Sequence, residues 1–357
     1  MKSRLLISIG MGVASLLVLT GCNPPMPESL KIELAERQVQ CGESFADAKL
    51  APEVADIANF WNSSMDEACS GAMGLNLIEE YPAANGIVIS EEKVTGCTPY
   101  ATVPLAVDAA VFSFFFTDIY ELNLSPEVIA RIFSGEINNW SDPAIAELNP
   151  LAPMPDLPIN IISQAPAGAI PAMEIWLGSA LGQSVELPIE PSTGSEVDAL
   201  YQMMDGDLKL TSFAALQLAG SSFANMVLDP ENPETTVVLP DVRTIQTAVG
   251  QTVISGEAPF LSFTYDPSIP AQPLPGQFEA LIPWGAVFPL EMSLCGEDDM
   301  QVRYVARFLL RLDAQGSIST GVFSPLNQAI RLKSVSVIAQ GLPEVEIPEE
   351  LERELQQ

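Results

Sequence analysis

The sequence predicts an α/β protein with two lobes, in which the chain crosses from one lobe to the other and returns. Strand-like and helix-like segments alternate along the 357 residues, and this alternation favours largely parallel sheets. The two long apolar stretches, 101–116 and 278–294, are separated by roughly 160 residues of other elements, as a crossing and a return require. At about 150 residues per domain, the length also suits two domains.

The first elements have clear local signals. Pro52 predicts the start of a helix over 51–61. The stretch 101–116 is rich in β-branched and aromatic residues, which is typical of a strand buried on both faces. Ser125 and Asp142 each precede a proline, so each predicts a helix with a polar cap and proline in its first turn. We expect further elements in this order: a helix that starts at Ser90, a strand at 159–162, and helices at 196–204, 241–248, 298–312 and 343–357.

The charge composition excludes several classes of function. The chain has 46 acidic residues against 15 Lys and Arg, with a formal net charge of -31, so a nucleic-acid backbone would repel it. It has no histidine, which excludes Ser-His-Asp and Cys-His catalytic sites and His-ligated zinc. We therefore expect no catalytic residues, no metal site and no cofactor.

The amino terminus has the pattern of an export signal. Lys2 and Arg4 precede an apolar run over 5–19 that is too short to cross a bilayer as a helix. The following Leu-Thr-Gly-Cys22 resembles the bacterial lipobox, which implies a signal peptide over 1–21 and a diacylated Cys22. Residues 22–30 would form a tether, and the protein would lie outside the cytoplasm on the bacterial cell membrane. The alternative is an ordinary cleaved signal with an incidental cysteine.

Four further cysteines predict disulfide bonds, because thiols outside the cytoplasm are usually oxidised. Cys41, Cys69, Cys97 and Cys295 allow three pairings. Since three of them lie in the first hundred residues, at least one bridge would join the two ends of the chain. The alternative is that some of them are free buried thiols.

One segment closely resembles the periplasmic phosphate-binding proteins of ABC transporters. Residues 123–150 read NLSPEVIARIFSGEINNWSDPAIAELNP, and the Trp140, Asp142-Pro143 and Asn149-Pro150 positions match the spacing of that family. Shorter matches are found at Gly42-Glu43-Ser44-Phe45-Ala46, at Cys69-Ser70-Gly71-Ala72, at Ser90-Glu91, and at 281–284 with the helix over 302–312.

The resemblance implies a two-lobed, type II periplasmic-binding-protein (venus flytrap) fold that captures a solute between its lobes. Lobe I would comprise 31–105 and 285–357, and lobe II 106–284. The solute would be presented to an ABC transporter permease. The first two ligand loops of the family would place Ser44, Phe45, Ser70 and Gly71 in the ligand site.

The ligand loop of lobe II departs from the family pattern. The family reads Arg-Ser-Asp-Gly-Ser-Gly-Thr where this chain reads QAPAGAIP over 164–171. A dehydrated phosphate needs a guanidinium, hydroxyl groups and backbone N–H donors, and prolines have no N–H. Ser163, Gln164 and Gly168 are the ligand-binding candidates that remain.

No nearby basic residue compensates for the missing arginine. The 77 residues between Arg131 and Lys209 contain no Lys or Arg, so we expect no cation beside the loop. Burying a phosphate without a cation is costly. The sequence therefore predicts a binding protein with weak or absent affinity for phosphate and a neutral, apolar or cationic ligand. The alternative is a surface lipoprotein of the same fold that acts through protein contacts, as an accessory or sensor module.

Overall fold

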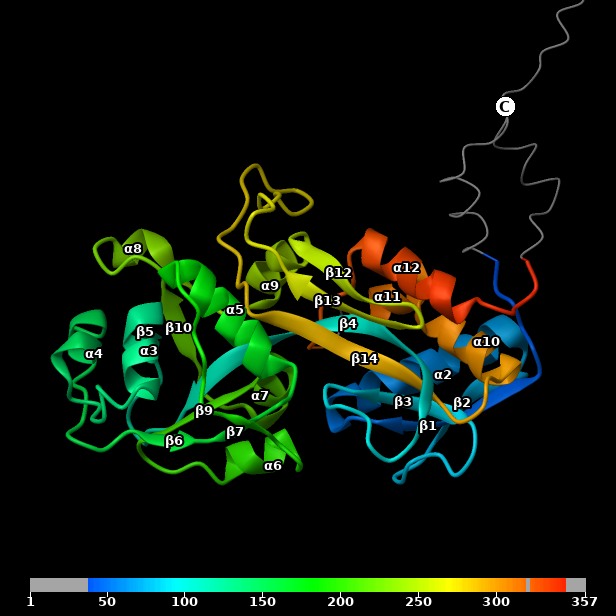
Figure 1. Ribbon diagram of the computed structural model, residues 1–357, viewed down its shortest axis with the longest axis horizontal. Coiled ribbons are helices and arrows are strands. Elements are labelled where there is room, and N and C mark those ends of the chain that lie inside the picture. The colour runs from blue at the N-terminus through cyan, green and yellow to red at the C-terminus, as the bar shows by residue number, and fades with distance from the viewer. Residues whose placement is uncertain (1–37, 319–321, 345–357) are drawn as a thin grey trace, which may run out of the picture. The chain divides into compact units, whose positions relative to one another are not determined.

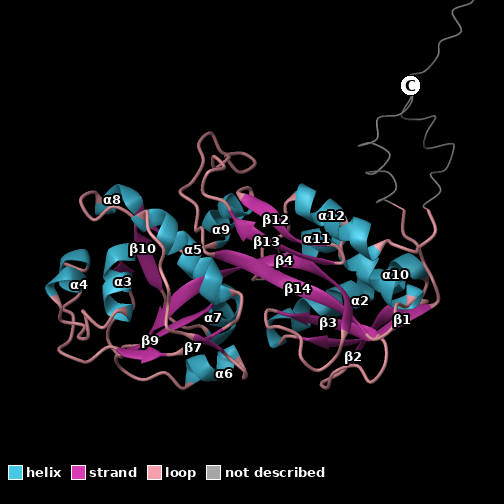
Figure 2. Ribbon diagram, in the orientation of Figure 1, coloured by secondary structure: helices cyan, strands magenta, loops and turns pink. Residues whose placement is uncertain are grey.

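The computed structural model describes residues 38–318 and 322–344, and Val39–Glu344 form one compact unit. A mixed nine-stranded sheet runs through this unit, with helices packed around it (Figures 1 and 2). No helix in the described part of the chain has the length and hydropathy to cross a membrane. The predicted signal peptide, the tether, Cys22 and most of the predicted helix over 343–357 lie outside the described residues.

Three parallel strands form one end of the sheet: β1 (Ser44–Leu50), β2 (Met73–Leu77) and β3 (Gly86–Ser90), with β1 in the middle. These strands and the helices packed on them are called the first layer below. A 3-10 turn over Pro52–Val54 leads from β1 into α2 (Ala55–Cys69). The helix predicted at Pro52 is thus confirmed and continues beyond residue 61. It packs through buried Trp61, whose Nε1 donates to Ser317 Oγ at 3.0 Å.

Two long strands connect the first layer to the rest of the molecule. Strand β4 (Pro99–Phe114) is the predicted buried strand, and β14 (Val287–Cys295) is the returning strand. The order of this part of the sheet is β2-β1-β3-β14-β4, so the late strand is inserted between two early ones (Figure 1). The predicted crossing and return are confirmed, although residues 278–286 form a loop and not the start of the strand.

The expectation of largely parallel sheets is wrong for the centre of the molecule. Strand β14 runs antiparallel to both β3 and β4, and β4 also runs antiparallel to β9 (Asp207–Ser212). The chain leaves the first layer along β4 and returns to it along β14, so these two strands run in opposite directions. Alternation of helices and strands indicates parallel pairs only where consecutive strands are neighbours.

The second layer is built on the carboxyl-terminal half of β4. This half of β4 pairs with β9, and β9 also pairs with β6 (Asn160–Ile162).

Both predicted caps are present: Ser125 Oγ accepts from Val128 N at 3.2 Å in α3 (Pro126–Phe133), and Asp142 caps α4 (Pro143–Leu148). The remaining elements are β5 (Leu122–Leu124), β7 (Gln164–Ala165), α5 (Ala169–Leu181), β8 (Glu190–Pro191), α6 (Glu196–Tyr201), α7 (Phe213–Ala219), β10 (Ala224–Val227), α8 (Pro233–Thr236), β11 (Val237–Val238), α9 (Val242–Val249), β12 (Thr252–Glu257), β13 (Phe260–Tyr265), α10 (Met300–Leu309), α11 (Leu312–Ile318) and α12 (Gln328–Ile338).

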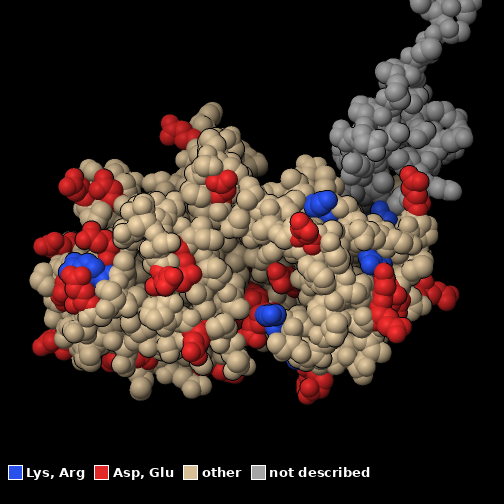
Figure 3. Space-filling view, viewed as in Figure 1, with Lys and Arg blue, Asp and Glu red and all other residues tan. Residues whose placement is uncertain are grey.

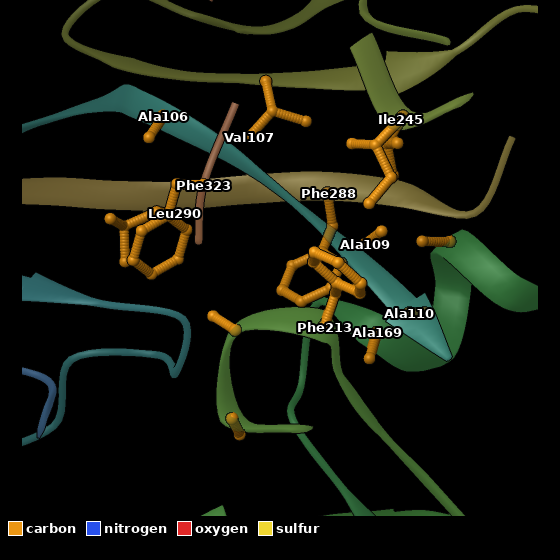
Figure 4. Close-up of a cluster of buried hydrophobic side chains, with 14 of the residues drawn as sticks. Ala106, Val107, Ala109, Ala110, Ala169, Phe213, Ile245, Phe288, Leu290 and Phe323 are labelled. Carbon is orange, nitrogen blue, oxygen red and sulfur yellow. The ribbon is translucent and has the colours of Figure 1, made fainter. Parts of the chain in front are cut away.

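Aromatic side chains pack against small residues where β4 and β14 cross between the layers. Figure 4 shows Phe213 and Phe288 close together beside Ala109 and Ala110. All four side chains are buried. The alanines leave space for the rings, so the two layers share one continuous core at this point.

Two disulfides are present, Cys41–Cys69 and Cys97–Cys295. The second bridge spans 198 residues and ties the start of β4 to the end of β14. The predicted bridge between the two ends of the chain is therefore confirmed.

Candidate ligand-binding cleft

A cavity of about 350 Å³ lies where β1 and β3 end. The carboxyl ends of parallel strands are the usual place for a ligand site in α/β sheets. The cavity is closed from the other side by Pro166 and by the segment 193–196, which belong to the second layer. Its lining therefore comes from both layers: Lys49, Leu50, Ala51, Pro52, Glu53, Tyr81, Val88, Ile89, Ser90, Glu91, Glu92, Pro166, Thr193, Gly194, Ser195 and Glu196.

A second cavity, of about 580 Å³, also has Glu91 in its wall. Its other walls are the start of α5, including Gly168, and the strands β13 and β14. Gly168 packs so closely on Phe288 that an added Cβ would lie 2.6 Å from the ring. Glu91 is thus the side chain common to both cavities.

Glu91 forms an acid–acid pair with Asp108 of β4. Burial raises the pKa of the Glu91 carboxyl well above its ordinary value, and the negative charge of Asp108 raises it further. Asp108 is buried and accepts hydrogen bonds from Ala109 N at 2.6 Å and from Ala214 N at 3.2 Å. Burial also raises the pKa of Asp108, but these N–H groups and the Glu91 side chain lower it, so Glu91 is the carboxyl of the pair that keeps its proton to higher pH.

The second buried pair, Lys209 and Glu196, corrects one expectation from the sequence. Lys209 of β9 places Nζ 2.6 Å from Gln164 O, so a cation does lie beside the altered ligand loop. It comes from the first basic residue after the 77-residue gap, because β9 returns directly beneath that loop. Glu196 Oε2 lies 3.1 Å from the same Nζ, and both side chains are buried. The lysine charge is therefore already neutralised.

The rim of the smaller cavity carries two more carboxyl groups. Burial raises the pKa of Glu53 and of Glu92, and the negative charge of Glu196 adds to both shifts. Lys49 lines the same cavity, but its Nζ donates to Glu79 O at 2.6 Å and lies 4.8 Å from the centre of the Tyr81 ring. Figure 3 shows acidic atoms with a basic group beside them where the two layers meet.

Four of the predicted ligand residues lie at the opposite edge of the first layer. Ser44 and Phe45 begin β1, where they pair with Met73 and Gly74 at the start of β2. Ser70 and Gly71 form the turn before β2. With about 3.3 Å per residue, the length of β1 separates Ser44 from the cavity by about 20 Å. The structure does not bring these four residues together with the lobe II loop.

The three predicted residues of lobe II lie nearer to the cleft. Ser163 and Gln164 use their backbone carbonyls, since Ser163 O accepts from Glu190 N and Gln164 O from Lys209. The Gln164 residue is exposed. Gly168 precedes α5 and lines the larger cavity, whereas the smaller cavity is lined by Pro166 of the same loop.

The short Ser90-Glu91 match does fall at the cleft. Ser90 ends β3 and its Oγ accepts from Glu92 N at 3.0 Å, which forms a turn. The helix expected to start at Ser90 is therefore wrong, because the serine satisfies a turn N–H rather than a helix N-terminus.

Sequence reasoning missed Glu196 of the cavity wall and the two buried side chains behind the wall, Asp108 and Lys209. Two of them had a usable signal, because Asp108 interrupts the apolar run 105–112 and Lys209 stands between Leu208 and Leu210. A lone charge inside a buried strand needs a partner. The partners Glu91 and Glu196 are distant in sequence, so only the fold identifies them.

The carboxyl groups of the cleft do not form a metal centre. Nowhere in residues 38–318 and 322–344 do three or more Asp, Glu or Cys side chains converge to hold a metal ion. The arrangement instead offers several separated carboxyl groups around a partly apolar space. Such a site can hold a small solute and favours a positive one over an anion.

Comparison with known proteins gives a short match in sequence and a match in fold. No family model matches the chain. The phosphate-binding protein PstS of Pasteurella multocida is 49% identical over 45 residues, which are 13% of this chain and 13% of the length of that protein. The resemblance in sequence to phosphate-binding proteins is thus confirmed, over a short segment.

Solved structures extend the similarity to the fold. The ancestral soluble variant of the human phosphate binding protein has a TM-score of 0.50 at 12% identity, over 86% of this chain and 97% of that one. A phosphate ABC transporter substrate-binding protein from Clostridium perfringens has a TM-score of 0.40 at 13% identity, over 79% and 100%. The chain therefore has the two-lobed α/β type II fold of periplasmic phosphate-binding proteins.

Proposed function

We propose that this protein is a lipid-anchored, extracytoplasmic solute-binding protein, without enzymatic activity, that delivers its ligand to an ABC transporter permease. Cys22 would carry the lipid. The lobes would be 31–105 with 285–357, and 106–284. The observation that carries the proposal is the cavity of about 350 Å³ at the ends of β1 and β3, since residues of both layers line it.

We propose further that the phosphate site of the family is degenerate in this chain. The cavity is lined by four glutamates, and Pro166 has no N–H to offer an anion. Both nearby lysines are already engaged, Lys49 by Glu79 O and Lys209 by Glu196. A phosphate placed here would meet carboxylates without a free cation, which opposes binding.

Calorimetric titration of inorganic phosphate into the purified protein at pH 8 tests this point, with tryptophan fluorescence as a second readout. We expect no saturable signal up to millimolar phosphate. Saturation in the micromolar range would contradict the degenerate site and would restore phosphate as the ligand.

The second candidate function, a surface lipoprotein that acts through protein contacts, has one observation in its favour. A hollow of about 610 Å³ in the second layer is bordered by Tyr120 and Leu151, whose exposed fractions are 74% and 99%. A thermal-shift screen of metabolites separates the two functions. A stabilising metabolite supports solute binding, and a screen without any response would favour the protein-contact function.

A further inference from the structure

We propose that the cavity of about 580 Å³ is a second binding site, which takes a neutral small molecule with an apolar body and one hydrogen-bond-donating group. It lies beside the cavity of about 350 Å³ that is proposed for the transported solute, and neither site depends on the other. Three features of the lining carry the proposal: a floor of strands with paired hydroxyl groups, one carboxyl group with acceptor capacity to spare, and rigid apolar sides.

The floor of this cavity is one face of the strands β13, β4 and β14, which are neighbours in the sheet (Figure 1). Phe260 of β13 pairs with Thr102 of β4, and Thr102 lies opposite Ser293 of β14. Alternate residues of a strand share a face, so Ser262 lies on the same floor as Phe260. Glu291 lies on the same floor as Ser293 for the same reason. The floor thus presents an aromatic ring, hydroxyl groups and a carboxyl group.

One polar group of the floor has acceptor capacity to spare. Thr102 Oγ1 and Ser293 Oγ lie 2.8 Å apart and form a hydrogen bond, so these two hydroxyl groups satisfy each other. The Ser262 side chain hydrogen-bonds the carboxyl group of Glu291. An ionised carboxyl group accepts up to about four hydrogen bonds. Glu291, which is only partly buried, therefore keeps acceptor positions for a donor of a ligand.

The sides of the cavity are apolar and rigid. The residues that line it at the start of α5, or just before, are small or prolyl: Ala167, Gly168, Pro171 and Ala172. Gly168 packs tightly on the Phe288 ring, which closes this end of the cavity. Proline has a fixed φ angle, and alanine and glycine have no side-chain rotamers to lose, so a ligand that binds here orders few groups. Apolar sides favour an apolar ligand body.

The charges around the cavity favour a neutral ligand. An anion would meet the carboxyl groups of both Glu91 and Glu291. Lys93 is the one basic side chain of the lining among the described residues, and it is exposed, so water screens its charge. A charged group of either sign would also lose its hydration against the apolar sides, which is costly.

The size of the cavity and one exposed ring indicate how such a ligand would lie. A volume of 580 Å³ falls within the range of about 300–1,000 Å³ that is usual for small-molecule sites. The Phe260 side chain is 50% exposed although it belongs to the floor. A ligand ring that stacks on Phe260 would cover this apolar surface. It would present its donor group to Glu291 on the same face.

The test uses N-phenyl-1-naphthylamine, a neutral aromatic amine with a single N–H group whose fluorescence increases in apolar surroundings. We expect a saturable increase on titration into the purified full chain at pH 7, with micromolar affinity. Phe260→Ala should weaken this binding about fivefold or more, because it removes the stacking surface. Phe278→Ala is the matched control, since that ring is fully exposed and does not line the cavity, and it should leave the affinity almost unchanged.

Competition between two naphthalene derivatives tests the donor group and the charge of the ligand. At pH 7, 2-naphthol is neutral and donates through its O–H, whereas 2-naphthoate is an anion without a donor. We expect 2-naphthol to displace the amine at a concentration about tenfold lower than 2-naphthoate, because only 2-naphthol can donate to Glu291. Glu291→Met removes both the acceptor and its charge, so this preference should be lost in that variant.

Three results would overturn the second site. They are a fluorescence signal that does not saturate, equal effects of Phe260→Ala and Phe278→Ala, and equal displacement by the two competitors. Thermal melts without ligand show whether each variant is folded. If Phe260→Ala is not, Ile175→Asp takes its place, because Ile175 is a partly exposed side chain of α5 in the same wall. Unchanged binding in Ile175→Asp would overturn the site equally.

Discussion

Two pairs of ionisable side chains lie behind the cleft, and the free-energy cost of burying their charges is compensated differently in each. Lys209 and Glu196 form an ion pair with Nζ and Oε2 3.1 Å apart, so their charges cancel. Glu91 and Asp108 are both acids, and burial raises the pKa of each, so a proton on Glu91 takes the place of an opposite charge. The first pair is held by opposite charges, whereas the second is stable in a buried position only while one of its carboxyls keeps a proton. The difference teaches that burial behind the cleft is compensated by charge in one pair and by a proton in the other.

The largest effect expected is that of Lys209→Met. This change leaves Glu196 buried without its cation, which costs about 3–5 kcal/mol for broken buried pairs. Urea unfolding at pH 7 measures the loss. Arg131→Met is the matched control, because it breaks the exposed pair of Arg131 with Glu136 and should cost less than about 1 kcal/mol. Equal losses in the two variants would show that the Lys209 pair is no more important than a surface pair.

Glu91→Gln should change the pH dependence of stability. The folded-state pKa of Glu91 is raised above its ordinary value of 4.5, so stability is fully present below about pH 4.5 and falls as pH rises. A glutamine keeps a donor for Asp108 and cannot ionise, so the variant should be more stable than the natural protein at pH 8 and little changed at pH 4.5. Unfolding curves at both pH values measure this gain. The control is Glu147→Gln, which changes an exposed carboxylate of α4. The prediction fails if Glu91→Gln destabilises the protein at pH 8 or has no more effect than the control.

A smaller effect is expected for Ser212→Ala. Ser212 Oγ caps α7 by accepting from Ala215 N at 3.2 Å, and its hydrogen bonds lower the pKa of both Glu91 and Asp108. Its loss should cost about 1 kcal/mol and raise the pKa of the acid pair, which carboxyl carbon NMR can follow.

Ser125→Ala is the matched control for Ser212→Ala. It removes a cap of the same type and the same 3.2 Å length from α3. The stability loss should be similar, and the pKa of the acid pair should stay unchanged. A pKa change in the control, or none in Ser212→Ala, would show that the serine does not act on the acid pair.

The sequence was sufficient for elements with local signals and insufficient for contacts between distant residues. The caps at Ser125 and Asp142 and the buried strand 99–114 depend on neighbours in sequence, and they could be predicted. The direction of β14 depends on which strands it meets, so periodicity could not predict it. The match over 42–46 falls at the start of β1 and not in a loop beside the cavity, because five residues cannot distinguish a loop from the start of a strand.

The site itself was predictable in part. The alteration of the loop over 164–171 was visible in the sequence, as was the short Ser90-Glu91 match that falls at the cleft. The acid pair could not be predicted, since 17 positions separate Glu91 from Asp108. Only the folded arrangement of β3 and β4 brings the two carboxyls together. Lys209 was missed for the same reason, because pairing of β6 with β9 places it under the loop.

Titration of inorganic phosphate at pH 8 tests the central claim most directly, because the cleft is lined by four glutamates and both nearby lysines are already engaged. The account predicts no saturable heat up to millimolar phosphate. Saturation in the micromolar range would contradict a cleft whose phosphate site is degenerate.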